Sequence, residues 1–170
     1  EAVFIFPLPE NAMITELIYW FNGNRYKANV RERQEAIDEY NRRLREWLDP
    51  VLLEYLGDNL FRLKIVPVDP NTEIRTEITY VELLDYDLGK ISYQFLLNTL
   101  DLSSKPLEKL TVNLSAVTQE SFNYFTVPSH EGNPSAMLSR VSDNEYHFFY
   151  GNENVTPDKD LLVEFSLHQD

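Results

Sequence analysis

Residues 73–80 read Glu-Ile-Arg-Thr-Glu-Ile-Thr-Tyr, and in this stretch isoleucine, threonine or tyrosine alternates with charged or polar side chains. Successive side chains of a β-strand point to opposite faces of a sheet, so a period of two predicts a strand with one buried face and one solvated face. The same alternation recurs in residues 61–65, where Arg62 and Lys64 separate apolar positions. This pattern predicts a mainly β fold class.

Further strands are expected on both sides of these two. The stretch Asn22-Gly23-Asn24 is typical of a hairpin turn, because glycine accepts a positive φ without steric cost. Many short strands joined by polar turns favour an antiparallel β-sandwich. The other expected strands are residues 2–6, 12–21, 25–30, 90–97, 110–114, 122–127, 137–141, 146–150 and 161–167.

Residues 31–48 have a different period, because their apolar side chains recur at steps of three and four. This spacing predicts an amphipathic α-helix, with Val51 to Leu56 forming a short second helix. The expected architecture is therefore an antiparallel β-sandwich with an inserted helix, in a single domain over residues 1–170 whose helical insertion spans about 31–56. The helix is expected to pack on a sheet. The alternative is a docking surface for an adjoining domain, formed by Trp47, Leu48, Leu52 and Leu53.

Composition and charge exclude several classes of protein. The chain has 170 residues and no cysteine, which excludes disulfides and cysteine-ligated metals. Its 28 Asp and Glu against 15 Lys and Arg give a net charge of -13, so nucleic acids and anionic membranes are not expected partners. No apolar run approaches the ~20 residues that a membrane-spanning helix needs, so no direct membrane insertion is expected. Because the chain begins at Glu1 rather than Met, we expect a processed or excised piece.

No pattern in the sequence points to catalysis. His130, His147 and His168 are scattered, and neither a Gly-x-Ser-x-Gly nor a phosphate-binding glycine loop occurs. The acidic groups most similar to calcium ligands are expected to be solvated turn charges, because they do not match the twelve-residue loop. We therefore predict no catalytic, metal or cofactor-binding residue, no cofactor and no enzyme, and the partner-binding residues stay unknown. A carboxylate-based hydrolase stays open without a chosen pair. The two groups of possible oxygen ligands are Asp69 with Asn71 and Glu73, and Asp158 with Asp160.

The corner Phe6-Pro7-Leu8-Pro9-Glu10-Asn11-Ala12 resembles the vault protein inter-alpha-trypsin family, also called VIT. The resemblance continues through residues 27–36, 59–65 and 77–95, and it covers residues 1 to about 100. Members of this family carry further strands before the corner, whereas five residues precede it here. The resemblance therefore implies a VIT-like domain that lacks its first strands.

The resemblance implies a non-catalytic protein-interaction or scaffold module of a larger protein, preceding a von Willebrand A domain. The expected partners are that adjacent domain and an unidentified protein, and the missing strands imply self-association through a sheet edge. A secreted, periplasmic or cell-surface location is favoured by the family. The alternative function is a carbohydrate-binding β-sandwich module, because 10 Tyr, 10 Phe and 2 Trp exceed what one core needs.

Overall fold

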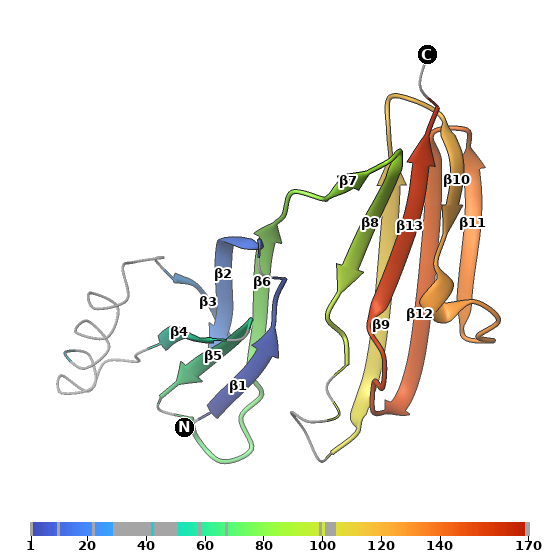
Figure 1. Ribbon diagram of the computed structural model, residues 1–170. Coiled ribbons are helices and arrows are strands. Elements are labelled where there is room, and N and C mark those ends of the chain that lie inside the picture. Colours follow the sequence, from blue (N-terminus) through green and yellow to red (C-terminus); the bar gives the residue numbers. More distant parts are fainter. Residues whose placement is uncertain are drawn as a thin grey trace. The chain divides into compact units, whose positions relative to one another are not determined.

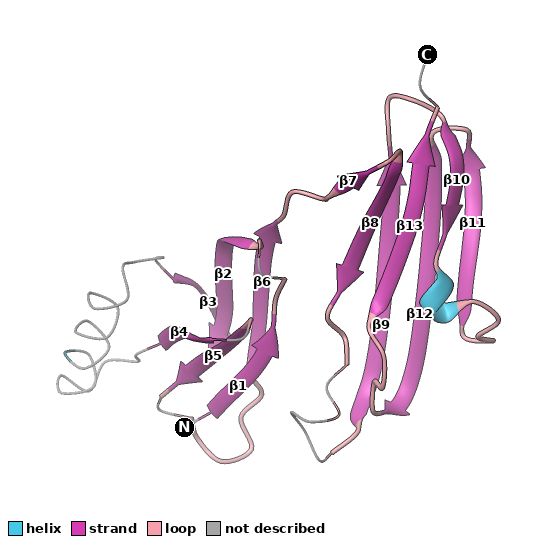
Figure 2. Ribbon diagram, in the orientation of Figure 1, coloured by secondary structure: helices cyan, strands magenta, loops and turns pink. Residues whose placement is uncertain are grey.

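The chain forms two compact units, Glu1–Leu83 and Leu84–Asp170, and each is described by itself. Whether the two units form one domain over residues 1–170, as the sequence predicted, depends on how they are joined. The single domain therefore stays a prediction. Figures 1 and 2 draw the strands of both units. The computed structural model describes residues 2–9, 11–21, 23–28, 42, 51–57, 59–66, 68–98, 100 and 105–168.

The first unit contains two antiparallel sheets of three strands each. In one sheet, β5 lies between β1 and β4, and in the other, β2 lies between β3 and β6. The mainly β, antiparallel prediction is therefore confirmed for this unit. The strands are β1 (Ala2–Pro7), β2 (Met13–Phe21), β3 (Asn24–Ala28), β4 (Val51–Gly57), β5 (Leu60–Ile65) and β6 (Arg75–Val81).

A small apolar core joins the two sheets of the first unit. Leu17 on β2 is buried together with Leu63 and Ile65 on β5, so residues from both sheets contribute to one cluster. On β6, exposed and partly buried residues alternate, as the period of two predicted. The corner after β1 places Leu8 in the interior, where its N–H donates to the carbonyl of Asn59 at 2.9 Å. Burial of one face thus explains the sequence alternation.

The expected short helix from Val51 to Leu56 is wrong, because this segment is strand β4 and pairs antiparallel with β5. Short apolar runs fit a buried strand and a buried helix equally well. Pairing decides the outcome here, since Glu54 lies beside Arg62 in the ladder and accepts a hydrogen bond from its Nε at 2.9 Å. The expected helix over residues 31–48 lies outside the described residues, apart from Arg42.

The second unit also contains two antiparallel sheets. One has the strand order β10-β13-β8-β7, and the other has the order β11-β12-β9 (Figure 1). The expected strands from residue 90 onward are confirmed, although β9 and β12 extend further than their apolar patterns indicated. The elements are β7 (Tyr86–Asp87), β8 (Lys90–Phe95), β9 (Leu107–Val117), β10 (Phe122–Thr126), the 3-10 helix η1 (Pro128–His130), β11 (Ala136–Ser142), β12 (Glu145–Val155) and β13 (Leu161–Leu167).

The core of the second unit is larger and aromatic. Phe122 makes edge-on contacts with Phe125, Tyr146 and Phe165, with ring centroids 5.3 to 5.6 Å apart. Such perpendicular arrangements are favoured by the charge distribution of aromatic rings. Because Phe122 lies on one sheet and Tyr146 on the other, these contacts join the layers. The buried members of the cluster are Phe122, Phe125, Val127, Phe148, Tyr150, Leu161 and Val163.

Candidate functional site

The three histidines lie on different elements and do not form one site. His130 is buried in η1, whereas His147 is exposed on β12, with its Nε2 2.7 Å from Glu145 Oε1. His168 is exposed directly after β13. Among the residues that the structure describes, no three His, Asp or Glu side chains gather closely enough to hold a metal ion.

Asp160, which the sequence offered as a possible cation ligand, accepts hydrogen bonds from backbone N–H groups instead. Its Oδ1 accepts hydrogen bonds from the N–H groups of Leu97 at 3.0 Å and Asn98 at 2.9 Å, and its Oδ2 accepts one from Gln94 Nε2 at 2.8 Å. These bonds fasten the end of β8 to the start of β13. Asp69 likewise belongs to a turn, in which its carbonyl accepts a hydrogen bond from the N–H of Thr72.

Among the described residues of the second unit, the most buried titratable group is the imidazole of His130. Its Nδ1 lies 2.8 Å from the hydroxyl of Ser129, and its ring packs edge-on against Tyr150 with centroids 4.6 Å apart. Burial lowers the pKa of His130, and the nearby positive charge of Lys159 lowers it further. Ser129 Oγ also accepts the N–H of Leu162 at 2.8 Å. The pair therefore ties η1 to β13, and its geometry is that of a structural clamp.

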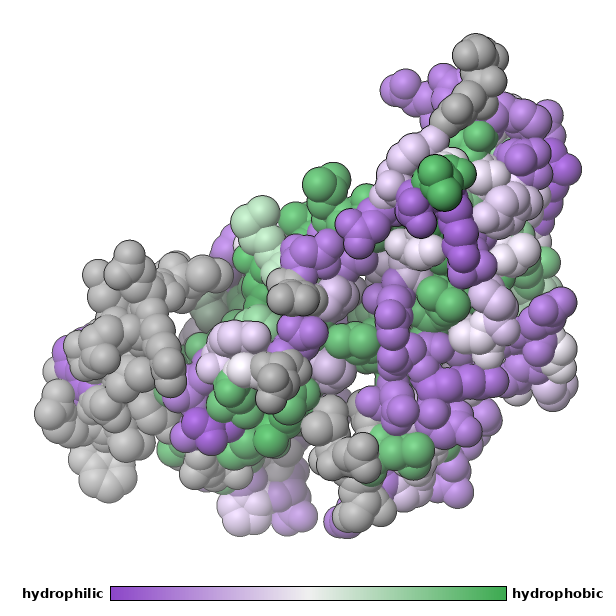
Figure 3. All heavy atoms as spheres, in the orientation of Figure 1, coloured by the Kyte–Doolittle hydropathy of each residue, from purple (hydrophilic) through white to green (hydrophobic). Residues whose placement is uncertain are grey.

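Strand β1 forms an exposed apolar edge of the first unit. It pairs with β5 on one side only, and the described residues place no strand on its other side. Val3, Phe4 and Ile5 are 49%, 40% and 45% exposed, so apolar side chains of both strand faces reach solvent. Figure 3 shows hydrophobic atoms, in green, at the surface of this unit. An edge strand of this kind presents unpaired N–H and C=O groups that another strand can match.

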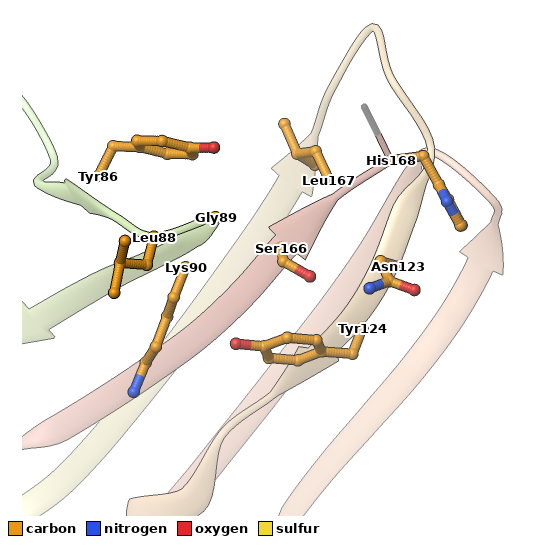
Figure 4. Close-up of a pocket in the computed structure, with 9 residues that line it drawn as sticks. All are labelled: Tyr86, Leu88, Gly89, Lys90, Asn123, Tyr124, Ser166, Leu167 and His168. Carbon is orange, nitrogen blue, oxygen red and sulfur yellow. The ribbon is translucent and has the colours of Figure 1, made fainter. Parts of the chain in front are cut away.

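A groove of about 700 Å³ crosses the β10-β13-β8-β7 sheet of the second unit (Figure 4). Tyr86 and Tyr124 come from β7 and β10, the two edge strands, and they are 58% and 37% exposed. Ser166 on β13 and Lys90 on β8 also line it. The register sets Ser166 on the same face of the sheet as Tyr124, whereas Tyr86, opposite Ile91, lies on the other face. Its other lining residues are Leu88, Gly89, Asn123, Leu167 and His168. We call this site the tyrosine groove.

Two features of the tyrosine groove decide what it can bind. Ser166 is only 8% exposed, and its hydroxyl has no hydrogen-bond partner among the described residues. A buried hydroxyl without a partner carries an energetic cost, and because the oxygen itself is shielded from solvent, it is not offered to a ligand. Lys90, a lining residue on β8, has its Nζ 2.5 Å from Glu164 Oε1. This hydrogen bond raises the pKa of Lys90.

The sequence did not single out these residues. Tyr86 lay outside the expected strands, while Tyr124 and Ser166 belong to strands that are adjacent only after folding. The surplus of aromatic residues was the one available signal, because it predicted that some rings reach the surface. That expectation is confirmed for Tyr86 and Tyr124.

Comparison with known proteins finds matches for part of the chain. The family model described as the vault protein inter-alpha-trypsin domain matches residues 1–80. Inter-alpha-trypsin inhibitor heavy chain H4 of Homo sapiens is 33% identical over 90 residues, which cover 52% of this chain and 10% of the relative. Heavy chain H3 of Mus musculus is 30% identical over 91 residues, covering 53% and 10%.

A second group of relatives has a different name. Protein mono-ADP-ribosyltransferase PARP4 of Homo sapiens is 25% identical over 96 residues, which cover 56% of this chain and 6% of the relative. The aligned part of the chain thus spans a tenth or less of each of these relatives. The resemblance read from the corner and its following blocks is confirmed. The structure adds that no helix among the described residues is long and apolar enough to cross a membrane.

Proposed function

Because residues 1–80 match the model of the vault protein inter-alpha-trypsin domain, we propose that this chain is a non-catalytic protein-interaction or scaffold module of a larger protein. The observation that carries the proposal is the exposed apolar edge of β1. Protein partners can extend a sheet by adding a strand to such an edge, where main-chain hydrogen bonds supply affinity and side-chain contacts supply specificity.

The proposed partner of β1 is an extended protein segment rather than a charged polymer. Val3 and Ile5 share one face of the strand and are exposed, so an added strand would cover apolar surface as well as pair its backbone. The net charge of -13 disfavours polyanionic partners. For the isolated chain, the partner strand available in solution is β1 of a second copy.

The test is self-association of the chain and of a matched pair of variants. Val3→Glu places a charge on the edge, and the register sets it beside Lys64, so the pairing with β5 is kept. Leu83→Glu makes the same charge change at an exposed residue outside any strand of the unit. We expect the mass measured by analytical ultracentrifugation to rise with concentration for the wild type and for Leu83→Glu but not for Val3→Glu. A monomer at every concentration over a hundredfold range contradicts the proposed edge.

The position of the module in its parent protein is also part of the proposal. We infer from the family that a von Willebrand A domain follows the chain and is an adjacent partner, and that the module works in a secreted, periplasmic or cell-surface protein. The coding sequence of the parent gene tests both inferences. The metal-dependent adhesion pattern of the von Willebrand A fold is Asp-x-Ser-x-Ser, and its presence within about 200 residues downstream, the length of one domain, supports the first inference. An upstream signal peptide supports the second, and the absence of these features counts against them.

A further inference from the structure

We propose that the second unit binds an extended protein segment, which pairs with the free edge of β9 and inserts apolar side chains between the two sheets of that unit. The proposal rests on residues of the second unit alone, whereas the edge of β1 belongs to the first. The two proposals therefore stand on different residues, and either can fail alone.

A groove of about 610 Å³ lies beside β9. Every residue from 111 to 117 lines it, although successive side chains of a strand point to opposite faces of the sheet. Val112 and Leu114 pack against the apolar core of the unit, whereas Asn113 and Ser115 are exposed on the other face. A cavity can be lined by both faces of one strand only where it borders the backbone edge between them. We call this cavity the β9 groove.

The edge of β9 that borders the groove has no strand on it among the described residues. Because β9 ends the strand order β11-β12-β9, its other edge is the one that pairs with β12 (Figure 1). The register with β12 runs without a shift from Leu107 to Val117. The backbone groups on the free side of β9 therefore have the regular, extended arrangement that an added strand can match.

The other edge strands of the second unit carry features that discourage pairing. β7 pairs with β8 at only two positions, and the registers of β10 and β11 each shift once, as at a β-bulge. Natural sheets protect their edges with short strands, bulges, charges and proline. Residues 110–117 of β9, which read Leu-Thr-Val-Asn-Leu-Ser-Ala-Val, have none of these features. Of the edges that the structure describes in this unit, β9 is thus the one that is open to a further strand.

The wall of the β9 groove that faces β9 is apolar. It includes Tyr93 and Phe95 on β8, and Leu161, Val163 and Phe165 on β13. Leu161 and Val163 are buried, while the three aromatic side chains are only partly covered. None of the described residues that line the groove is charged. An added strand would therefore bury apolar side chains at every second position, and charge complementarity favours a segment without charges in its centre.

The shape of the β9 groove favours a free segment over a sheet of a second copy. Sheets that pack face to face lie about 10 Å apart, so the space beside β9 admits one further strand and its side chains. A strand that already belongs to another sandwich brings its neighbouring strands and a packed layer with it. The occupant that we propose is therefore a segment of another protein that is unfolded before it binds and has apolar side chains at alternate positions.

Calorimetric titration of a synthetic peptide into the Val3→Glu protein tests the proposal. This background blocks the edge of β1, so the result does not depend on the function proposed for that edge. The probe alternates valine with threonine over the length of residues 111–117 and ends in lysines, which the negative charge of the chain attracts. We expect saturable binding. An isomeric peptide with consecutive valines should bind about tenfold more weakly, because only half of its valines can face the groove.

The result that overturns the proposal is the absence of saturable binding of the alternating peptide. A modified peptide separates strand pairing from simple apolar contact, because N-methylation of every amide keeps the side chains but removes the backbone donors. We expect no binding of the methylated peptide. Equal binding of both peptides would show an apolar site without strand addition and would contradict the proposal.

Variants assign the binding to the β9 groove. Ala116→Leu should weaken it about tenfold, since the larger side chain occupies space in the groove that Ala116 lines. Val117→Lys changes a groove residue that is 69% exposed and should also weaken binding, because lysine on an edge strand opposes pairing. Met137→Lys makes the same kind of change at an exposed residue of β11, the other edge strand of the sheet, and should bind as the parent protein does.

Thermal unfolding of each variant checks that the fold is kept. Binding that both groove variants leave unchanged contradicts the assignment to the β9 groove. Self-association of the Val3→Glu protein that Val117→Lys abolishes would place a second copy in the groove, and it would also contradict the proposed occupant.

Discussion

The two units share an architecture of paired antiparallel sheets, but they differ in how their buried apolar residues are grouped. The first unit has a compact cluster of three buried residues, Leu17, Leu63 and Ile65, and leaves β1 exposed at the edge. The second unit buries seven residues in one cluster, four of them aromatic. The family match lies on the first unit, so the recognisable part of the chain is the one with the smaller described core.

This difference separates two kinds of information in a sequence. The residues of the corner after β1 are set by a local geometry, in which Pro7 ends the strand, Leu8 enters the core and the carbonyl of Pro9 accepts the N–H of Ala12. A packed aromatic interior such as that around Phe122 accepts many residue combinations of similar volume. Local geometry therefore leaves a recognisable motif, while a large core leaves mainly a pattern.

Removing one large side chain from each core should have the largest effect. Leu63→Ala should cost about 2–5 kcal/mol and Phe122→Ala about 3–5 kcal/mol, because each leaves a cavity in a buried cluster. Both tryptophans, at positions 20 and 47, belong to the first unit, so their fluorescence in denaturant follows that unit alone. We expect Leu63→Ala to shift the fluorescence midpoint and Phe122→Ala to leave it unchanged. Equal shifts for both variants would show that the two cores unfold as one.

Acid should weaken the second unit through His130. Burial places the pKa of His130 below its unfolded value of about 6.5, so the unfolded chain binds a proton that the folded chain does not. The stability that this histidine contributes is present above that pH and is lost as the pH falls below it. Circular dichroism midpoints in denaturant at pH 7.5 and 5.5 measure the loss.

Two variants isolate this histidine from the carboxylates that also titrate. His130→Asn can keep a nitrogen or oxygen near Ser129 Oγ but cannot take up a proton, so it should reduce the loss between the two pH values. His168→Asn changes an exposed histidine of the same unit and should show the full loss. Identical pH dependence in all three proteins would contradict the role of His130.

Glu82 of the first unit should show a smaller effect of the opposite sign. Its Oε2 is buried without a hydrogen-bond partner among the described residues, and burial raises its pKa above 4.5. Its ionisation therefore costs stability as the pH rises above 4.5. Glu82→Gln should raise the fluorescence midpoint at pH 7 and not at pH 4, while Glu73→Gln, at an exposed position, should change neither. A loss of stability in Glu82→Gln at pH 7 would show that the carboxylate has a stabilising partner.

Gly151→Ala should have the smallest effect, although its new Cβ would lie 2.8 Å from a ring carbon of Phe149. That ring belongs to a partly exposed side chain and can rotate away, so we expect a change within about 0.5 kcal/mol. The midpoint measured by circular dichroism tests this. A cost of about 2 kcal/mol or more would place the Phe149 ring in a fixed position that its exposure does not suggest.

The strands were predictable where one face is buried, and not where pairing partners decide. Residues 61–65 and 73–80 carry a clear alternation and lie in or beside β5 and β6. Val51 to Leu56 has apolar residues at nearly every position, so its period could not separate helix from strand. The boundary at Leu83 and Leu84 has no change of composition to mark it.

The tyrosine groove could not be predicted, because its residues are far apart in the sequence. Tyr86, Tyr124 and Ser166 are brought onto one sheet by the order β10-β13-β8-β7, which period and propensity do not encode. The unpartnered hydroxyl of Ser166 is likewise a property of packing, since nothing about a serine in a strand shows whether neighbours will reach it. Sequence reasoning gives the number of surplus rings and not their place.

Because β7 is short, it is the most weakly paired strand of its sheet. It pairs with β8 through only two positions, Tyr86 with Ile91 and Asp87 with Lys90, so few backbone bonds hold this strand in place. Its amide protons should exchange with heavy water sooner than those of β13, which is flanked by strands on both sides.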